Sequence, residues 1–232
     1  MKLGVDLLSS DVLAIEVENL TVGYDGGLSL FESVSFSLRE GECAAVRGES
    51  GSGKSTLLHC ICGLIPRSIK ADIAGSVKLF GRPVEEYRRH ELAQTIGIVF
   101  QDPETQLFCD TVEDEIAFGP ENIRLCREDI SDRIDECLKL TGLEKYRLVS
   151  PKNLSGGQKQ LVALAAVLSL RPRILLFDEA FSQLDEAGRG SLMDHVAALR
   201  DSGKTILLAD HDTACLSAAE KTIYLGGGRD ER

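Results

Sequence analysis

Glu42-Cys-Ala-Ala-Val-Arg-Gly48-Glu-Ser-Gly-Ser-Gly-Lys54-Ser55 is the stretch that decides the fold. Its first six residues are mostly apolar, as in a short buried strand, and residues 55–64 after it have a helical pattern that Pro66 ends. Strand, glycine-rich loop and helix in this order match the phosphate-binding loop G-x-x-x-x-G-K-S/T. The glycines let backbone N–H groups converge on phosphate oxygens, and the helix N-terminus adds a favourable dipole. The stretch therefore predicts a nucleotide site.

Within this site the individual side chains have separate predicted roles. Lys54 is expected to reach the β- and γ-phosphates, and the Ser55 hydroxyl to hold Mg²⁺. The predicted nucleotide contacts in this part of the chain are Gly48, Glu49, Ser50, Gly51, Ser52, Gly53, Lys54, Ser55 and Thr56.

A second motif supplies carboxylates. Ile174-Leu-Leu-Phe-Asp178-Glu179 is an apolar strand that ends in two acidic residues, and α/β sheets bind ligands at such strand ends. Asp178 is expected to coordinate Mg²⁺ directly or through water. Glu179 is expected to be the general base for the attacking water.

Strands and helices alternate along most of the chain, which predicts an α/β fold with a parallel sheet and helices on both faces. A middle stretch from Asp102 to Ser150 is acidic and helical, and we expect it to form an inserted lobe. Its amphipathic helix is expected to end at Thr141, before Gly142. A buried helix is expected at Leu161–Leu170. The predicted strands outside the two motifs are Ala14–Leu20, Val34–Leu38, Val77–Phe80, Ile96–Phe100, Thr205–Ala209 and Thr222–Leu225.

Composition narrows the class of protein. The 232 residues carry 26 Lys and Arg against 37 Asp and Glu, a net charge of −11, which disfavours nucleic acid as the main partner. No run reaches the roughly 18 apolar residues that cross a bilayer, and the N-terminus lacks the apolar core of a signal peptide. We therefore expect a protein that stays in the cytosol. The seven cysteines contain no C-x-x-C pair and are expected to be small buried apolar residues.

Leu154-Ser155-Gly156-Gly157-Gln158-Lys159-Gln160 opens a long apolar helix. Its serine, Ser155, lies 23 residues before Asp178. Ser and Gly at a helix start form a second phosphate-binding N-terminus. Because one nucleotide does not need two such sites, we expect this motif to close over the nucleotide of another copy or a homologue.

With these motifs the chain resembles the ATP-binding-cassette (ABC) ATPases over nearly its whole length. The resemblance implies a P-loop cassette with a mostly parallel sheet, an N-terminal antiparallel β region and an inserted α-helical subdomain. It implies a nucleotide-binding core of residues 1–100 and 159–232, and a helical subdomain of residues 101–158. The cofactors implied are ATP and Mg²⁺.

The resemblance also assigns roles to single residues. It makes Gln101 a catalytic glutamine that senses Mg²⁺ and the γ-phosphate, and His211 the residue that orients the γ-phosphate and water. It places the Tyr24 ring on the adenine. The residues implied to contact the partner's ATP are Ser155, Gly156, Gly157, Gln158 and Asp185. Three residues depart from the common pattern without removing a catalytic group: Ala180, Phe181 and Asp210.

Phe100-Gln-Asp-Pro-Glu-Thr-Gln-Leu-Phe108, with residues 111–122 after it, resembles the energy-coupling-factor (ECF) branch of importers of vitamins and transition-metal ions. That branch implies a second ATPase protomer, a multi-spanning membrane scaffold and a small membrane-embedded substrate-binding subunit. It places the chain on the cytoplasmic face of the membrane. The acids expected to face basic residues of the scaffold are Asp102, Glu104, Glu113, Asp114 and Glu115. The sequence stops soon after the core, so the C-terminal dimer contacts of many ECF ATPases are expected to be reduced.

Two other hypotheses remain open on the sequence. One is the ATPase of a conventional ABC transporter with two homologous membrane subunits. The other is a soluble ABC ATPase that remodels nucleic acid or ribosomes, against which stand the single cassette, the charge of −11 and the absence of a heptad run. The transported solute is not encoded in this chain, and import rather than export rests on the resemblance.

Overall fold

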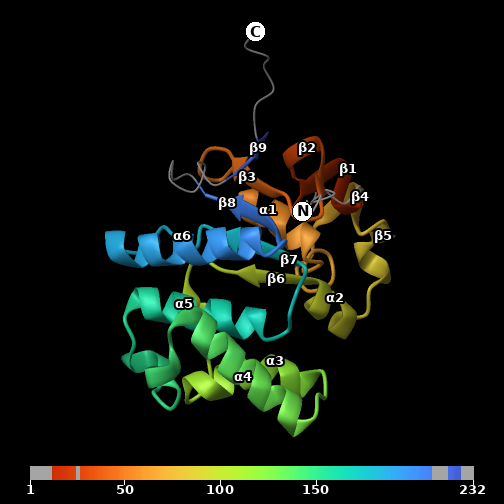
Figure 1. Ribbon diagram of the computed structural model, residues 1–232. Helices are drawn as coiled ribbons and strands as arrows, with labels where there is room; N and C mark the ends of the chain where they lie inside the picture. Colours follow the sequence, from red (N-terminus) through yellow and green to blue (C-terminus); the bar gives the residue numbers. More distant parts are fainter. Residues whose placement is uncertain (1–11, 25–26, 211–218, 226–232) are drawn as a thin grey trace, which may run out of the picture.

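Two sheets of different kinds form the framework (Figure 1). The computed structural model describes residues 12–24, 27–210 and 219–225. One sheet is antiparallel, in the order β2-β1-β4-β5, and the other is parallel, in the order β6-β7-β8-β3-β9. The predicted fold class, with its N-terminal antiparallel region, is confirmed. The strands are β1 (Leu13–Gly23), β2 (Ser29–Arg39), β3 (Cys43–Arg47), β4 (Asp72–Leu79), β5 (Arg82–Pro83), β6 (Ile96–Val99), β7 (Ile174–Asp178), β8 (Thr205–Ala209) and β9 (Lys221–Tyr224).

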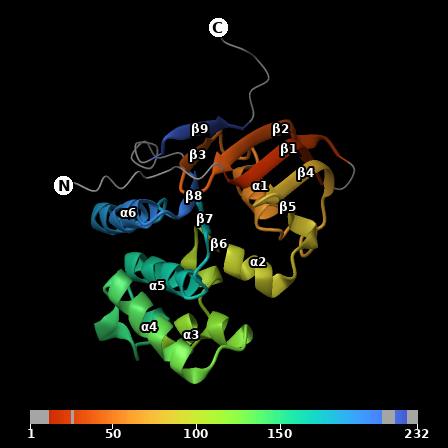
Figure 2. The ribbon, with the colours of Figure 1, turned by 45° about the vertical axis from the view of Figure 1, so that its right-hand side comes forward.

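Helices cover the parallel sheet on both faces, as the alternating pattern predicted (Figures 1 and 2). The α-helices are α1 (Lys54–Ile61), α2 (Arg89–Thr95), α3 (Val112–Asn122), α4 (Arg127–Thr141), α5 (Gly156–Leu168) and α6 (Glu186–Asp201). Short 3₁₀ turns lie at Val84–Glu86, Pro103–Thr105, Glu144–Tyr146 and Pro151–Asn153.

The central strands are buried on both faces. Every residue of β7 and β8 is buried, which explains their uninterrupted apolar sequences. Because side chains alternate along a strand, β7 divides its residues between two cores. Ile174 and Leu176 pack with α1 and the antiparallel sheet, whereas Leu175 and Phe177 pack with α5 and α6. This sandwich fixes the carboxyl end of β7, where Asp178 and Glu179 follow.

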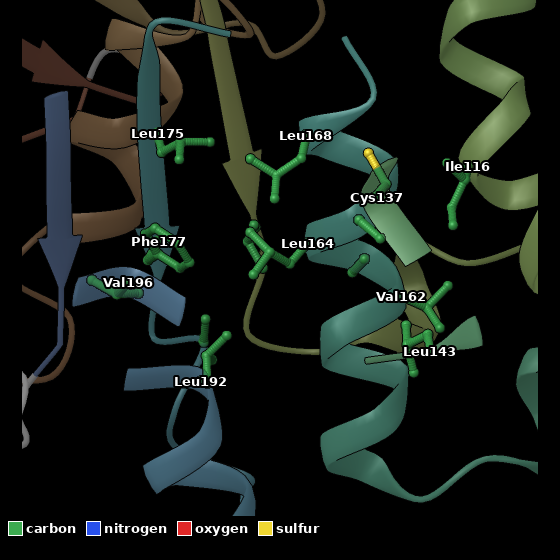
Figure 3. Packing of buried hydrophobic residues seen from close by; sticks show 14 of the residues in the cluster. Ile116, Cys137, Leu143, Val162, Leu164, Leu168, Leu175, Phe177, Leu192 and Val196 are labelled. Atoms are coloured by element: carbon green, nitrogen blue, oxygen red, sulfur yellow. The ribbon is translucent and has the colours of Figure 1, made fainter. Parts of the chain in front are cut away.

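The second core joins the sheet to the helical part of the chain. Figure 3 shows Leu175 and Phe177 of β7 facing Leu164 and Leu168 of α5, with residues of α6 beside them. Burying one such side chain contributes about 1.5–3 kcal/mol. On its other side α5 packs against α3 and α4, so the inserted lobe is attached to the sheet through α5. The division of the chain into a nucleotide-binding core and a helical subdomain of residues 101–158 stays a prediction.

Several predicted boundaries were shifted. Helix α1 ends at Ile61, earlier than the expected Leu64, because Gly63 adopts a left-handed φ of 71°. Helix α5 ends at Leu168 instead of Leu170, and β4 begins at Asp72 instead of Val77. Gly142 ends α4 with a φ of 67°, as predicted.

One acidic residue of the lobe was wrongly expected on the surface. The Glu115 side chain is buried, and its Oε1 accepts the backbone N–H groups of Phe108 and Cys109, the latter at 2.9 Å. Glu115 lies between Val112 and Ile116 on the buried face of α3. Its carboxylate accepts hydrogen bonds from backbone N–H groups of the turn before the helix. It therefore supplies no charge for a partner.

Replacing Glu115 by Ala is expected to lower the free energy of unfolding by about 1–3 kcal/mol, because two backbone N–H groups lose their acceptor. Urea denaturation measures this change. Glu121→Ala, at an exposed position of the same helix, is the control and is expected to stay within about 0.5 kcal/mol of the wild type. Equal stability of the two variants would show that water replaces the carboxylate at no cost.

The cysteines only partly follow the prediction. Six are free thiols in the part of the chain that the structure describes, and Cys215 lies outside it. Burial raises the pKa of Cys43 to about 11 and that of Cys60 and Cys137 to about 12, as expected for apolar packing. Cys126 is exposed, where it caps α4 by accepting the N–H of Asp129.

Candidate nucleotide site

The loop between β3 and α1 is shaped by glycines. A Cβ on Gly48 would lie 2.6 Å from the backbone oxygen of Leu225, so a side chain has no room there. Gly51 and Gly53 have φ of 82° and 96°, a region that favours glycine. Gly53 caps α1 without a side-chain hydrogen bond, which leaves the first N–H groups of the helix pointing at the loop. The Ser52 hydroxyl is buried with no hydrogen-bond partner among the described residues, as suits a group that meets a phosphate oxygen.

Lys54 places a cation inside this loop. Its side chain is 4% exposed, and the Nζ donates to the backbone oxygens of Gly48 and Glu49 at 3.1 and 3.2 Å. The same Nζ lies 3.5 Å from Oε1 of Glu179. Lys54 thus links the loop to Glu179, directly after the end of β7. The terminal phosphate of a nucleotide bound in the loop would lie near both side chains.

Ser55 and Asp178, two residues expected to hold Mg²⁺, are in contact. The Ser55 hydroxyl donates to Oδ1 of Asp178 at 2.8 Å, across 123 residues of sequence. Burial raises the pKa of Asp178, while this hydrogen bond acts against the rise. Two hard oxygen donors at this spacing fit Mg²⁺, which takes one or two protein oxygens and fills its other positions with water and phosphate.

Glu179 has an unusual backbone that fixes its position. Its φ is 48°, a left-handed conformation that non-glycine residues rarely adopt. Three hydrogen bonds hold it there: its N–H donates to Ala209, and its carbonyl accepts from the Ser182 amide and hydroxyl. Strain of this kind is concentrated at functional sites. Its half-buried carboxylate is thereby directed at Lys54.

The other predicted contacts are placed less completely. The Tyr24 hydroxyl lies 3.2 Å from the Thr56 hydroxyl, so its ring is beside the start of α1. The Gln101 amide donates to the hydroxyl of Ser182, in the segment after Glu179, at 3.1 Å. Their roles toward adenine and Mg²⁺ stay predictions. His211 lies outside the described residues.

The second helix start is well formed. The Ser155 hydroxyl accepts the Gln158 N–H at 3.3 Å, and the Gln158 side chain accepts the Ser155 N–H at 2.9 Å, a reciprocal capping box. Ser155 and Gly156 are exposed, and a Cβ on Gly156 would meet nothing within 4 Å. Asp185 caps the neighbouring helix α6 by accepting the N–H of Gly188 at 2.8 Å. The surface around Ser155 and Gly156 is therefore accessible to a second molecule.

Comparison with known proteins shows the family. The model of the ABC transporter family matches residues 31–182, more than half of the chain. The chain belongs to the ABC transporter family. The energy-coupling factor transporter ATP-binding protein EcfA of Carboxydothermus hydrogenoformans is 38% identical over 94% of this chain and 79% of its own length. EcfA of Methanosarcina acetivorans is 39% identical over 93% of this chain and 77% of its own.

Solved ABC cassettes have the same fold. The structure of CbiO1 from Clostridium perfringens, part of an ABC transporter complex, matches with a TM-score of 0.83 at 32% identity, over 94% of this chain and 87% of that one. A dimeric cassette in a post-hydrolysis state with ADP and Pi matches with a TM-score of 0.80 at 30% identity. The match covers 94% of this chain and 97% of that one. The chain spans only 38% and 34% of the length of two longer ABC transporter ATP-binding proteins from Methanosarcina.

Packing accounts for two of the three departures from the common ABC pattern. Ala180 and Phe181 are each 1% exposed, and the Phe181 ring lies 6.1 Å from that of Phe177. They extend the second core directly past Glu179 and leave its carboxylate at the site. Asp210 is buried at the end of β8.

Sequence reasoning missed three residues that support the motifs. Gln106 bonds the end of β6 twice, donating to the Ile98 carbonyl and accepting the Phe100 N–H. Gln160 of α5 donates to the Phe100 carbonyl at 2.9 Å, and Tyr146 accepts from Gln158 at 2.8 Å. A polar residue on the apolar face of α5 was the available signal for Gln160; the other two depend on contacts made only in the fold.

Gly48→Ala is expected to weaken ATP binding by at least about tenfold, because a displaced loop loses aligned N–H donors worth more than about 1.4 kcal/mol. Equilibrium titration with a fluorescent ATP analogue measures the effect. Gly190→Ala is the control, since a Cβ there meets nothing within 4 Å and α6 favours Ala over Gly. Unchanged affinity in Gly48→Ala would mean that this loop does not bind the phosphates.

Proposed function

We propose that this chain is the ATP-hydrolysing subunit of an ECF-type importer, working as one half of a head-to-tail pair of cassettes. The observation that carries the proposal is the cluster at the ends of β3 and β7, in which Lys54 lies 3.5 Å from Glu179 and Ser55 bonds Asp178 at 2.8 Å. The names of the EcfA relatives and of CbiO1 support the choice of branch.

In the proposed mechanism the loop N–H groups and Lys54 bind the β- and γ-phosphates of ATP. Ser55 and Asp178 would hold Mg²⁺, which when bound neutralises the charge of the phosphates. Glu179 accepts the proton of the attacking water as ATP is cleaved to ADP and phosphate. Gln101 and His211 are proposed to sense and orient the γ-phosphate. Tyr24 is proposed to stack on the adenine.

The partner cassette is proposed to complete the site. Ser155 and Gly157 of one protomer close over the ATP bound by the other, with Gly156, Gln158 and Asp185 beside them. A helix N-terminus that is capped within its own chain and open to solvent suits this role, because its dipole favours an approaching phosphate. Hydrolysis would then reopen the pair.

The membrane scaffold is proposed to dock beside the segment that follows β6. Phe108 and Phe118 are 64% and 46% exposed and stack edge to face with centroids 4.7 Å apart. A hollow of about 360 Å³ next to Phe108 is lined by Glu104, Leu107, Phe108, Cys109, Pro151, Lys152 and Lys159.

Charge has a smaller part in this docking than the sequence suggested. Glu104 pairs with Lys159 and Glu113 with Arg147. Asp102 accepts the Glu104 N–H, and Asp114 accepts the Thr111 hydroxyl at the start of α3. We therefore propose that apolar contact with the two phenylalanines anchors the scaffold. No helix in the described ranges is long and apolar enough to span a membrane, and the proposed location is the cytoplasmic face.

The proposal is tested by tagging the chain, extracting native membranes in mild detergent and identifying the proteins that copurify. A multi-spanning scaffold with a small membrane-embedded binding subunit is the expected result, and the small subunit would identify the solute. Two homologous membrane subunits would instead indicate a conventional ABC transporter. Recovery with ribosomes or DNA in the soluble fraction would contradict transport.

A further inference from the structure

The start of helix α5 is bonded to the segment after β6 at two points. Gln160, which is 1% exposed, donates its side-chain amide to the Phe100 carbonyl at 2.9 Å. On the surface side, the residue just before it, Lys159, forms an ion pair with Glu104. The two contacts join the helix that carries Ser155 to the residues on either side of Gln101.

The segment itself is held as a closed turn. The side chain of Gln106 donates to the Ile98 carbonyl at 3.2 Å and accepts the Phe100 N–H at 3.3 Å. Asp102 accepts the Glu104 N–H at 2.9 Å within the same turn. Phe100 is bonded covalently to Gln101, and these hydrogen bonds hold both residues in one closed turn.

Gln160 is costly where it lies. Its Oε1 is buried and has no hydrogen-bond partner in the part of the chain that the structure describes. An apolar residue would fill the position without that cost, as most neighbours on α5 do. The hydrogen bond to the Phe100 carbonyl offsets this cost. Among the hydrogen bonds of the described residues, it is the one polar contact between the buried face of α5 and the end of β6.

We infer that Gln160 is a positioning residue that transmits the occupancy of a chain's own nucleotide site to its signature helix. Gln101 responds to the nucleotide bound by the P-loop, Phe100 moves with Gln101, and Gln160 passes the displacement to Ser155 at the start of α5. Since Ser155 serves the partner's ATP, the relay couples the two sites of the pair. The inference rests on the proposed function, because it needs the composite sites.

Hydrogen–deuterium exchange tests the relay within one molecule. The full-length wild type and Gln160→Met are compared with and without a slowly hydrolysed ATP analogue and Mg²⁺, at a chain concentration at which light scattering reports monomers. In the wild type the nucleotide is expected to slow exchange of the amides of residues 156–160 by at least about threefold. In Gln160→Met this response is expected to disappear, while the affinity for the analogue stays unchanged.

Thr141→Val is the matched control. Thr141 is also buried and polar, but its hydroxyl bonds the Cys137 carbonyl inside α4, so the exchange response is expected to persist. If Gln160→Met does not fold, Gln160→Asn, which keeps the amide and shortens its reach, takes its place with the same outcomes. An equal response in Gln160→Met and wild type, or no response in the wild type, would overturn the relay. Failure of the proposed function is seen separately, in the proteins that copurify with the chain from native membranes.

Discussion

Glu179→Gln is expected to lower the rate of ATP hydrolysis by about 10²–10⁴-fold while ATP still binds. Gln has the size and shape of Glu but does not accept the proton of the attacking water. The backbone of residue 179, with its φ of 48° and its bonds to Ala209 and Ser182, does not depend on the carboxylate, so the geometry of the site is retained. Phosphate release and equilibrium ATP binding are the two measurements.

The control for this variant is Glu186→Gln, which changes an exposed glutamate in the first turn of α6. Its turnover is expected to equal that of the wild type. Because the loop and Lys54 are unchanged in Glu179→Gln, ATP-bound dimers are expected to accumulate in that variant. Turnover within a few-fold of the wild type would remove Glu179 from the role of general base.

The grouping of Lys54, Ser55, Asp178 and Glu179 could be predicted from sequence because these residues lie in two short motifs. The glycines, lysine and serine of a P-loop lie in one continuous stretch. The apolar pattern of β7 predicts a buried strand that ends at Asp178. Bringing Ser55 within 2.8 Å of Asp178 requires only that both strands belong to one parallel sheet, with their carboxyl ends on one edge.

Features that depend on contacts between distant segments could not be predicted. The left-handed φ of Glu179 could not be predicted, since one of the bonds that hold it comes from Ala209 of β8, a distant segment. The acidic run 113–115 suggested a charged surface, yet the period of α3 turns Glu115 inward while Glu113 meets Arg147. Gln160 could be noticed as a polar residue on the apolar face of α5, but its partner Phe100 is known only from the fold. Charge runs are thus weaker evidence for a docking surface than motifs are for a nucleotide site.

Ser155→Arg is expected to lower the rate of ATP hydrolysis by at least about 100-fold, because the arginine keeps the partner's phosphates away from the helix N-terminus that stabilises them. The arginine would occupy the exposed space beside Gly156 and remove the capping hydroxyl. Loss of the cap alone costs about 1 kcal/mol of stability. Ser155→Ala separates the two effects, since it loses the cap without adding bulk. Single-site ATP binding is expected to be unchanged in Ser155→Arg, and a wild-type rate would contradict a composite site.

Mixing Ser155→Arg with Lys54→Ala tests the head-to-tail arrangement directly. Each variant alone has two damaged sites in its dimer, because every site takes its P-loop from one chain and its Ser155 from the other. A mixed dimer has one site with an intact Lys54 from the first variant and an intact Ser155 from the second. Hydrolysis above the sum of the two separate preparations is therefore expected. If each cassette completed its own site, mixing would restore nothing, since neither chain carries both groups.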